Sequence, residues 1–370
     1  MSAKTGGTFR RVVVKLGSGV LSAGTGKLDA ATIRRLSRDI GAARALGVEM
    51  VVVSSGAILA GAESLALKTR PATTQLKQAA AAVGQSRLMR AWEGGLARER
   101  LKAAQILLTR EDLRQRQRYL NARNTIFTLL RLGVVPVINE NDTVSVDEIK
   151  FGDNDVLSAL VAGLCEADLL VLLTDQDGVF TADPRRDAAA SLIPVFDASA
   201  RARIGKAGPS GSGGMESKVS AASMAAAGGL QAVVASGAKT GTLAAILAGE
   251  RPGTWFLPKG APASRRRQWL AYAANPRGQI VVDEGARRAL VTGLKSLLPS
   301  GVRSVAREFE AGDVVSLVEG GREFARGLTN YGSRELEKIM GKKTAEILAL
   351  LGHKPADEVV HRDNMAVLES

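Results

Sequence analysis

The chain alternates continuous apolar runs with segments of helical periodicity. Apolar runs without polar alternation occupy residues 12–16, 48–53, 134–138, 169–173 and 231–235. Between them, apolar positions recur at helical spacing in residues 31–46, 74–99, 120–132, 155–165 and 216–227. Continuous Val, Leu and Ile runs are typical of strands buried on both faces, and their alternation with helices indicates a parallel sheet covered by helices. We therefore predict one α/β domain over residues 1–264.

The pattern changes after residue 250. Residues 251–278 contain several prolines and the basic triplet at 265–267, with little periodicity, which is typical of a linker. Short strand-like pieces follow at residues 279–283, 304–309, 313–318 and 323–328, separated by Gly and Pro turns. Two helical segments come next, at residues 333–340 and 344–351. We predict a linker at residues 265–278 and a small, mostly β domain with a C-terminal tail over residues 279–370.

Composition and charge narrow the class of protein. With 370 residues and 45% hydrophobic positions, the chain can bury sizeable cores, which excludes a disordered or collagen-like chain. The formal charge of +13 favours a polyanionic partner, either nucleic acid or a phosphorylated small molecule, and does not choose between them. Most of this excess lies in residues 1–150, where solvated helix faces are the simplest explanation.

Other counts indicate the compartment. The single cysteine, Cys165, excludes a disulfide framework and a cysteine-based zinc site, and two histidines disfavour a metal cluster, so we expect no protein-held metal. Residues 1–8 are polar, and no apolar run approaches the roughly 20 residues of a membrane span. We expect a cytoplasmic protein without a membrane segment.

Two of the predicted strands end in small polar and glycine-rich segments. Lys15 lies at the carboxyl end of the first strand and a Gly-x-Gly follows it directly. Ser22 stands where a dinucleotide fingerprint has its third glycine, so a turn glycine is the simpler interpretation of the glycines alone. Lys15 itself lies where open α/β sheets bind ligands. Ser54, Ser55 and Gly56 follow the second strand and precede a helix; they would serve as N-caps, or would present N–H groups to a phosphate or carboxylate.

Three further clusters carry polar chemistry. Asn139 to Asp142 follow the third strand, and Asp153 to Asp155 stand at the start of the next helix. Together they form either a solvated loop with a helix cap or a site for an ammonium group. Thr174 and Asp175 end the fourth strand. A glycine loop precedes Lys218 on a helix, which allows close approach of an anion, and the absence of a Walker motif disfavours a P-loop nucleotidase.

In this order, the motifs resemble those of the glutamate 5-kinase branch of the amino-acid kinase family, along essentially the whole first domain. Segments of residues 279–370 resemble the PUA domain, which binds RNA in RNA-modifying enzymes and which these kinases commonly carry. The resemblance implies the amino-acid kinase fold, a mainly parallel sheet between helices, plus the small mostly-β PUA domain. It leaves RNA binding open, because a fold does not fix a function.

The resemblance also implies an activity and a site. The family transfers the γ-phosphoryl group of ATP to the side-chain carboxylate of L-glutamate, the first step of proline synthesis, with Mg²⁺ carried by phosphates and water. It implies catalytic roles for Lys15, Lys218 and Asp155, with backbone N–H groups near Gly17 and Gly56 around the transferred group. It places glutamate at Ser55, Asn139, Asp142, Asp153 and Asn154. It places the nucleotide at Lys15, Gly17, Thr174, Asp175, Ser212, Gly213, Gly214, Met215, Glu216, Ser217 and Lys218.

The same resemblance implies partners: proline as a feedback ligand, a glutamyl phosphate reductase that takes the product, and a homo-oligomer. Two alternatives stay open. One is an RNA-binding PUA protein with a relic kinase domain, against which the intact Lys15, Asp155 and Lys218 argue. The other is a member of the family that acts on another acidic substrate, such as aspartate, acetylglutamate, carbamate or uridylate.

Overall fold

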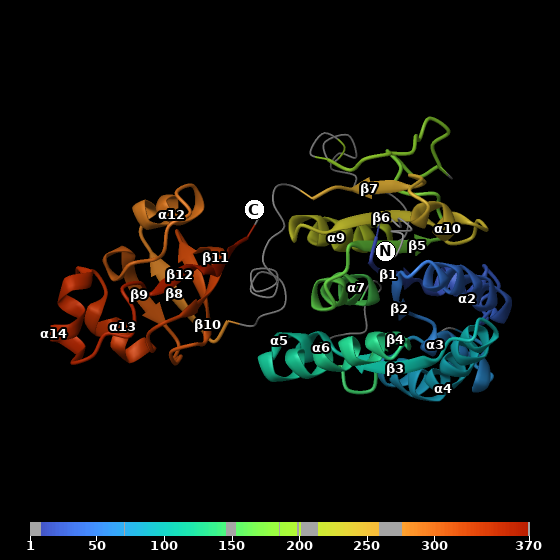
Figure 1. Ribbon diagram of the computed structural model, residues 1–370, viewed down its shortest axis with the longest axis horizontal. Helices are drawn as coiled ribbons and strands as arrows, with labels where there is room; N and C mark the ends of the chain where they lie inside the picture. The colour runs from blue at the N-terminus through green and yellow to red at the C-terminus, as the bar shows by residue number, and fades with distance from the viewer. Residues whose placement is uncertain are drawn as a thin grey trace, which may run out of the picture. The chain divides into compact units, whose positions relative to one another are not determined.

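A computed structural model describes residues 9–69, 71–145, 153–184, 186–197, 200, 214–258 and 276–368. The chain forms two compact units, and each is described by itself (Figure 1). Among the described residues, no helix is both long enough and apolar enough to cross a bilayer.

The first unit is built on a seven-stranded sheet in the order β3-β4-β2-β1-β5-β6-β7. The strands are β1 (Arg11–Leu16), β2 (Glu49–Ser54), β3 (Ala103–Leu108), β4 (Val135–Glu140), β5 (Leu169–Thr174), β6 (Gln231–Ser236) and β7 (Thr254–Phe256). All neighbours pair in parallel except β7, which is antiparallel to β6. Because β1 lies between β2 and β5, the strand order reverses at β1, and such a switch point is where open α/β sheets bind ligands.

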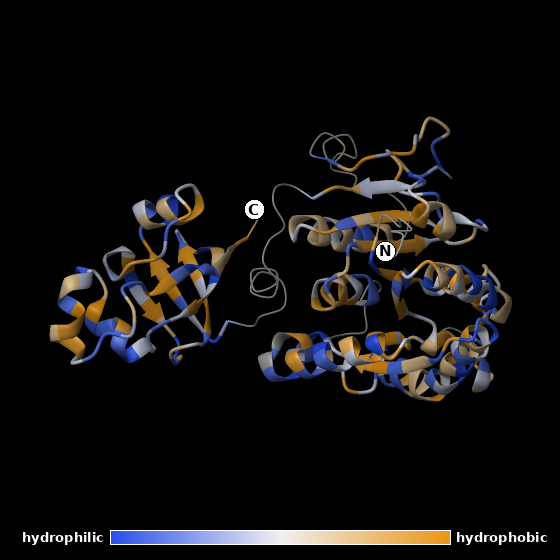
Figure 2. Cartoon of the chain, viewed as in Figure 1, coloured by the Kyte–Doolittle hydropathy of each residue, from blue (hydrophilic) through white to orange (hydrophobic). Residues whose placement is uncertain are grey.

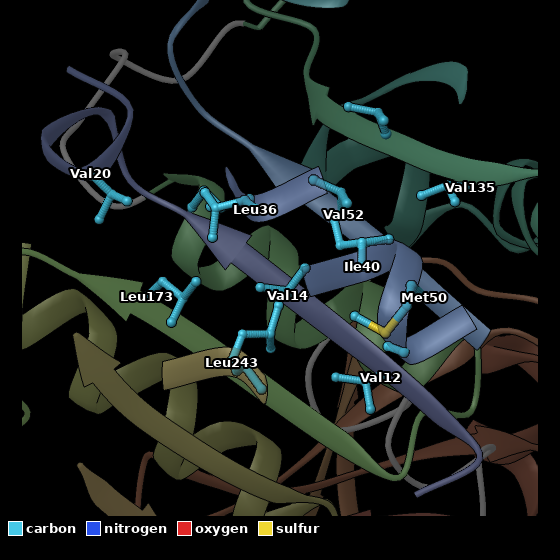
Figure 3. Packing of buried hydrophobic residues seen from close by; sticks show 14 of the residues in the cluster. Val12, Val14, Val20, Leu36, Ile40, Met50, Val52, Val135, Leu173 and Leu243 are labelled. Carbon is cyan, nitrogen blue, oxygen red and sulfur yellow. The ribbon is translucent and has the colours of Figure 1, made fainter. Parts of the chain in front are cut away.

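Helices cover both faces of this sheet (Figure 1). On one face, Val12 and Val14 of β1 pack with α2 (Ala30–Ala45), α4 (Thr74–Arg98) and α10 (Thr242–Leu247) (Figure 3). On the other face, Val13 belongs to a cluster with α6 (Arg116–Arg131), α7 (Asp153–Leu164) and α9 (Gly214–Ala227). The shorter helices are α1 (Ser18–Ser22), α3 (Ala57–Ser64) and α5 (Arg110–Arg114). The sheet between these two layers is largely apolar (Figure 2).

The structure confirms the α/β architecture and the five predicted strands of the first domain, within one or two residues at their ends. It adds β3 and β7, which the apolar pattern did not predict. The residues of β3 are mostly half-buried at the edge of the sheet, and β7 has only three residues. Neither strand therefore produces the long apolar run of a strand buried on both faces.

The second unit contains a five-stranded sheet in the order β12-β11-β10-β8-β9. Its elements are β8 (Gly278–Val282), α12 (Glu284–Val291), η3 (Pro299–Gly301), β9 (Val302–Ala306), β10 (Val314–Glu319), β11 (Arg322–Thr329), α13 (Ser333–Ile339), η4 (Thr344–Glu346), α14 (Ile347–Leu351) and β12 (Val360–Val367). The β10–β8 pair is parallel and the other pairs are antiparallel. The mostly β prediction is confirmed, while the predicted helix at 344–351 is a 3₁₀ turn followed by a short α-helix.

The boundaries 1–264, 265–278 and 279–370 stay a prediction. Residues 259–275, which include most of the proposed linker, lie outside the described residues. The last strand of the first sheet, β7, ends at Phe256, before that segment in the sequence, and the first strand of the second sheet, β8, begins at Gly278, after it.

Candidate active site

Strand alternation places two cations of β1 on the same face. Successive side chains of a strand point to opposite faces, so Arg11 and Lys15 share the α7 and α9 face with Val13. Arg11 donates to the backbone oxygen of Cys165, just beyond the end of α7, and Lys15 pairs with Asp155 in its first turn. Helix α7 is therefore tied to β1 at both ends, and a cation at its C-terminal end also suits the helix dipole.

Asp155 bridges two lysine ammonium groups. Its Oδ1 lies 2.5 Å from Lys15 Nζ and its Oδ2 lies 3.4 Å from Lys218 Nζ. Lys15, Asp155 and Lys218 are only 3%, 1% and 9% exposed. One carboxylate offsets one of the two cations, so the cluster carries a net positive charge next to a cavity. A buried charge excess is costly unless a counter-charge pairs with it, so the arrangement suits an anion.

Burial and charge act in opposite directions on these groups. Burial lowers the pKa of Lys15, and the charge of Lys218 lowers it further, while the charge of Asp155 raises it; the net direction is down. Burial raises the pKa of Asp155, but the charges of Lys15 and Lys218 and the hydrogen bonds from Lys15 and Ser217 together outweigh that effect and hold its pKa below the usual value. Asp155 is therefore an ionised, acceptor-only group that orients both lysines rather than a general base.

The first turn of α9 completes the support of Asp155. The Ser217 hydroxyl lies 2.6 Å from Asp155 Oδ2, and it also lies 3.0 Å from the backbone oxygen of Gly214. Lys218 Nζ donates to the same Gly214 oxygen at 2.9 Å. Two consecutive residues of α9 thus contact one carboxylate of α7, which fixes the lysine relative to the carboxylate.

The cluster opens into a cavity of about 860 Å³ at the carboxyl ends of the central strands. Its lining includes Lys15, Gly17, Ser55, Gly56, Asn139, Asp142, Asn154, Asp155, Thr174, Asp175, Gly214 and Lys218. A Cβ at Gly17 would lie 3.7 Å from Lys15 Nζ, so glycine leaves the ammonium group open on that side. Gly56 has a φ of +110°, which favours glycine at the turn into α3. The residues present therefore suit a phosphate or carboxylate group.

An amide and hydroxyl chain lines another part of the cavity. Asn154 Nδ2 donates to Ser55 Oγ at 3.2 Å and to Asn139 Oδ1 at 3.0 Å. The backbone N–H of Glu140 donates to Asn139 Oδ1 at 2.9 Å. Three side chains from β4, α7 and the turn after β2 are thereby held together, while a site for an ammonium group stays a prediction.

The remaining predicted residues have different surroundings. Thr174 Oγ1 donates to Asp175 Oδ1 at 3.0 Å at the end of β5, and both line the cavity, as does Asp142. The Met215 side chain is buried in the apolar cluster below α9, and Glu216 is exposed. Asp153 begins α7, but its side chain, together with Ser212 and Gly213, lies outside the described residues.

Sequence reasoning missed two contributors. Ser217 was assigned to nucleotide binding only, whereas its hydroxyl supports Asp155. Gln85 of α4 belongs to none of the sequence motifs, although its side chain accepts a hydrogen bond from Asn139. A serine directly before the helical lysine was a usable signal, because neighbouring residues at a helix start lie close to the same ligand. No local signal pointed to Gln85.

The described residues offer little for a metal held by protein alone. Within them, no group of three or more His, Cys, Asp or Glu side chains is arranged to hold a metal ion.

The fold and this site define the class of protein. The chain belongs to the amino acid kinase family, because residues 10–236 match the sequence model of that family. Residues 278–351 match the model of the PUA domain. Within that family it belongs with the glutamate 5-kinases. It is 50% identical to the glutamate 5-kinase of Pelobacter propionicus over 97% of this chain and 98% of that protein, and 51% identical to that of Myxococcus xanthus over 97% and 96%. Among solved structures, a UMP kinase from Bacillus anthracis is similar at 17% identity with a TM-score of 0.48, covering 68% of this chain and 97% of that one.

Proposed function

We propose that this protein transfers the γ-phosphoryl group of ATP to the side-chain carboxylate of L-glutamate and so forms γ-glutamyl phosphate, the first step of proline biosynthesis. The observation that carries the proposal is the pair of buried ammonium groups on Asp155, open to one cavity at the carboxyl ends of the central strands. The glutamate 5-kinase relatives, similar along almost the whole chain, supply the identity of the substrates.

Charge repulsion is the physical obstacle in this reaction. A carboxylate has to approach a triphosphate, and both are anions at neutral pH. Lys15 and Lys218 lower that repulsion because their charges are fixed beside the cavity before either substrate arrives. Fixed charges in a largely dry site stabilise developing charge without further reorganisation, which contributes about 3–4 kcal/mol where single donors have been removed.

No general base is needed for the attack. The substrate carboxylate is already ionised near pH 7, since the unperturbed pKa of a glutamate side chain is about 4.3. Catalysis then consists of positioning and charge neutralisation, as in other phosphoryl transfers. Asp155 keeps the two lysines apart and oriented, and the open side of Gly17 leaves room for an oxygen of the transferred group beside Lys15.

The polar part of the cavity suits the amino-acid end of the substrate. Ser55, Asn139 and Asn154 provide hydroxyl and amide groups, and Asp142 adds a carboxylate to the lining that complements an α-ammonium group. The nucleotide would occupy the side of Thr174, Asp175 and the start of α9. Mg²⁺ would be carried by the phosphates and water and would neutralise their charge.

The decisive experiment is a glutamate-dependent assay with two readouts, ADP release and trapping of the acyl phosphate as a hydroxamate with hydroxylamine. The wild-type protein should release ADP and form hydroxamate with glutamate, and should release no ADP with aspartate, acetylglutamate, carbamate or uridylate. Lys218→Met should lose at least about 100-fold in turnover, the scale reported for removal of one preorganised donor. Lys102→Met, at an exposed position before β3, is the matched control. Turnover with another acidic substrate, or full activity of Lys218→Met, would contradict the proposal.

The same proposal extends to partners. Proline would inhibit the enzyme as a feedback ligand, a reductase would consume the labile product, and the enzyme would act as a homo-oligomer. Adding proline to the hydroxamate assay tests the first of these, and sedimentation tests the last. An RNA-binding protein with a relic kinase domain is not favoured, because Lys15, Asp155 and Lys218 line one cavity together with Asn139 and Asn154.

A further inference from the structure

The orientation of the Asn139 amide is fixed by a backbone donor. The N–H of Glu140 lies 2.9 Å from one end of this amide, and a backbone N–H requires an acceptor, so that end is Oδ1. The other end is then Nδ2, which donates to Gln85 Oε1 at 2.9 Å. Asn139 is 2% exposed, so a lost partner at either end would not be replaced by bulk water.

The same logic sets the direction of the next two groups. Asn139 Oδ1 accepts from Asn154 Nδ2, and the second hydrogen of that amide goes to Ser55 Oγ. The N–H of Glu140 also lies 3.3 Å from Asn154 Oδ1, which agrees with this orientation. Ser55 Oγ is therefore an acceptor toward the protein, and its own hydrogen has no acceptor within the described residues. Ser55 lines the cavity, so this hydrogen is available to a ligand.

We propose that Gln85 is a positioning residue which, through Asn139 and Asn154, makes Ser55 a hydrogen-bond donor toward a carboxylate oxygen of the substrate. The inference rests on the proposed function and deepens it. Among the described residues, Gln85 is not part of the cavity lining, and its side chain reaches the site through its hydrogen bond with Asn139. A substrate carboxylate needs a hydrogen-bond donor from the protein, because an ionised carboxylate only accepts hydrogen bonds. Hydrogen bonds to charged acceptors are also roughly twice as strong as those between neutral groups.

Helix packing holds Gln85 in place relative to Ser55. Helices α3 and α4 cross with their backbones in contact: a Cβ at Gly84 would lie 1.9 Å from the oxygen of Ala57, and a Cβ at Gly61 would lie 1.7 Å from the oxygen of Ala80. Gly84 directly precedes Gln85, and α3 begins two residues after Ser55. The crossing therefore fixes both ends of the hydrogen-bond chain to one rigid helix pair.

The test compares two substitutions of similar size in the full-length protein. Gln85→Met removes the acceptor for Asn139 Nδ2, and Gln85→Glu keeps it. We expect Gln85→Met to raise KM for glutamate about tenfold, equivalent to about 1.4 kcal/mol, with KM for ATP unchanged. Gln85→Glu should restore KM for glutamate to within about threefold of the wild-type value. Calorimetric titration with glutamate alone gives a readout independent of turnover, and Gln85→Leu replaces Gln85→Met if the latter fails to fold.

A double-mutant cycle with Ser55→Ala tests the route of the effect. If Gln85 acts through Ser55, the affinity of the double variant for glutamate should lie within about twofold of that of Ser55→Ala alone. Additive losses, equal changes in KM for both substrates, or a Gln85→Glu variant as weak as Gln85→Met would overturn the inference. Failure of the wild-type protein to turn over glutamate would instead refute the proposed function, so the two failures are distinguishable.

Discussion

Lys15 Nζ and Asp155 Oδ1 lie 2.5 Å apart, both buried, at the point where the central strand β1 meets the start of α7. This contact joins a strand near the beginning of the chain to a helix that starts about 140 residues later. Because the second oxygen of the same carboxylate faces Lys218, a change at Asp155 affects both cations at once.

Asp155→Asn should reduce turnover by at least about 100-fold and shift the pH profile. The charge of Asp155 raises the pKa of Lys15, against burial and Lys218, which lower it. Without that charge the pKa of Lys15 falls further, so the protonated form is lost at lower pH and the alkaline limb of the profile shifts to lower pH. The assay is glutamate-dependent ADP release as a function of pH. Glu284→Gln, at an exposed pair in the second unit, is the control, and an unshifted alkaline limb would contradict the role of Lys15.

Ser217→Ala should lower kcat about tenfold with little change in KM for glutamate, because it removes a charge-assisted hydrogen bond that orients Asp155. Ser217→Thr keeps the hydroxyl and should retain most of the activity. Steady-state kinetics of the two variants measure the difference. Equal activity of the Ala and Thr variants would show that the hydroxyl has no positioning role.

Gly61→Ala should destabilise the protein by several kcal/mol, because the new Cβ would overlap the backbone of Ala80 and force α3 and α4 apart. Gly94→Ala, on α4, meets no atom within 4 Å and should raise stability by up to about 1 kcal/mol through helix propensity. Thermal denaturation followed by circular dichroism compares them. A Gly61→Ala midpoint equal to that of the wild-type protein would contradict the close crossing.

Cys165 should react slowly with iodoacetamide in the native protein. Burial raises the pKa of its thiol to about 12, and the residue is 0% exposed, so the reactive thiolate is both scarce and inaccessible at pH 8. Because it is the only cysteine, mass spectrometry of the intact protein gives the labelling rate directly. We expect at least about 100-fold faster labelling in urea. Comparable rates with and without urea would mean that the end of α7 opens readily.

The apolar pattern was sufficient for the central strands and insufficient at the sheet edges. Strands β1, β2 and β5 are largely buried on both faces, and such strands need a continuous apolar run over most of their length. At the edge this requirement disappears: Gln105 of β3 is exposed, so the strand resembles a polar segment. What the pattern cannot encode is the register, such as Val12 opposite both Met50 and Leu169, which depends on pairing distant strands.

For a similar reason, some residues of the site could be predicted from the sequence and others could not. Lys15, Asp155 and Lys218 stand in short motifs at strand ends and helix starts, where sequence position implies spatial position. Gln85 stands in the middle of the long helix α4, 54 residues from Asn139. Its contact exists only because glycines allow α3 and α4 to cross closely, and helix crossings are a property of packing rather than of local sequence.

The central position of β1 also has a consequence for the order of folding. The backbone N–H of Arg11 at the start of β1 donates to the carboxylate of Asp168, directly before β5 and 157 positions later. Strand β1 therefore remains without one of its two neighbours until most of the first unit has been synthesised. Contacts between such distant residues slow folding, because a long loop must close before they form. During synthesis, β1 and β2 would therefore expose an apolar strand edge, the period in which the nascent chain is most prone to aggregate and most dependent on chaperones.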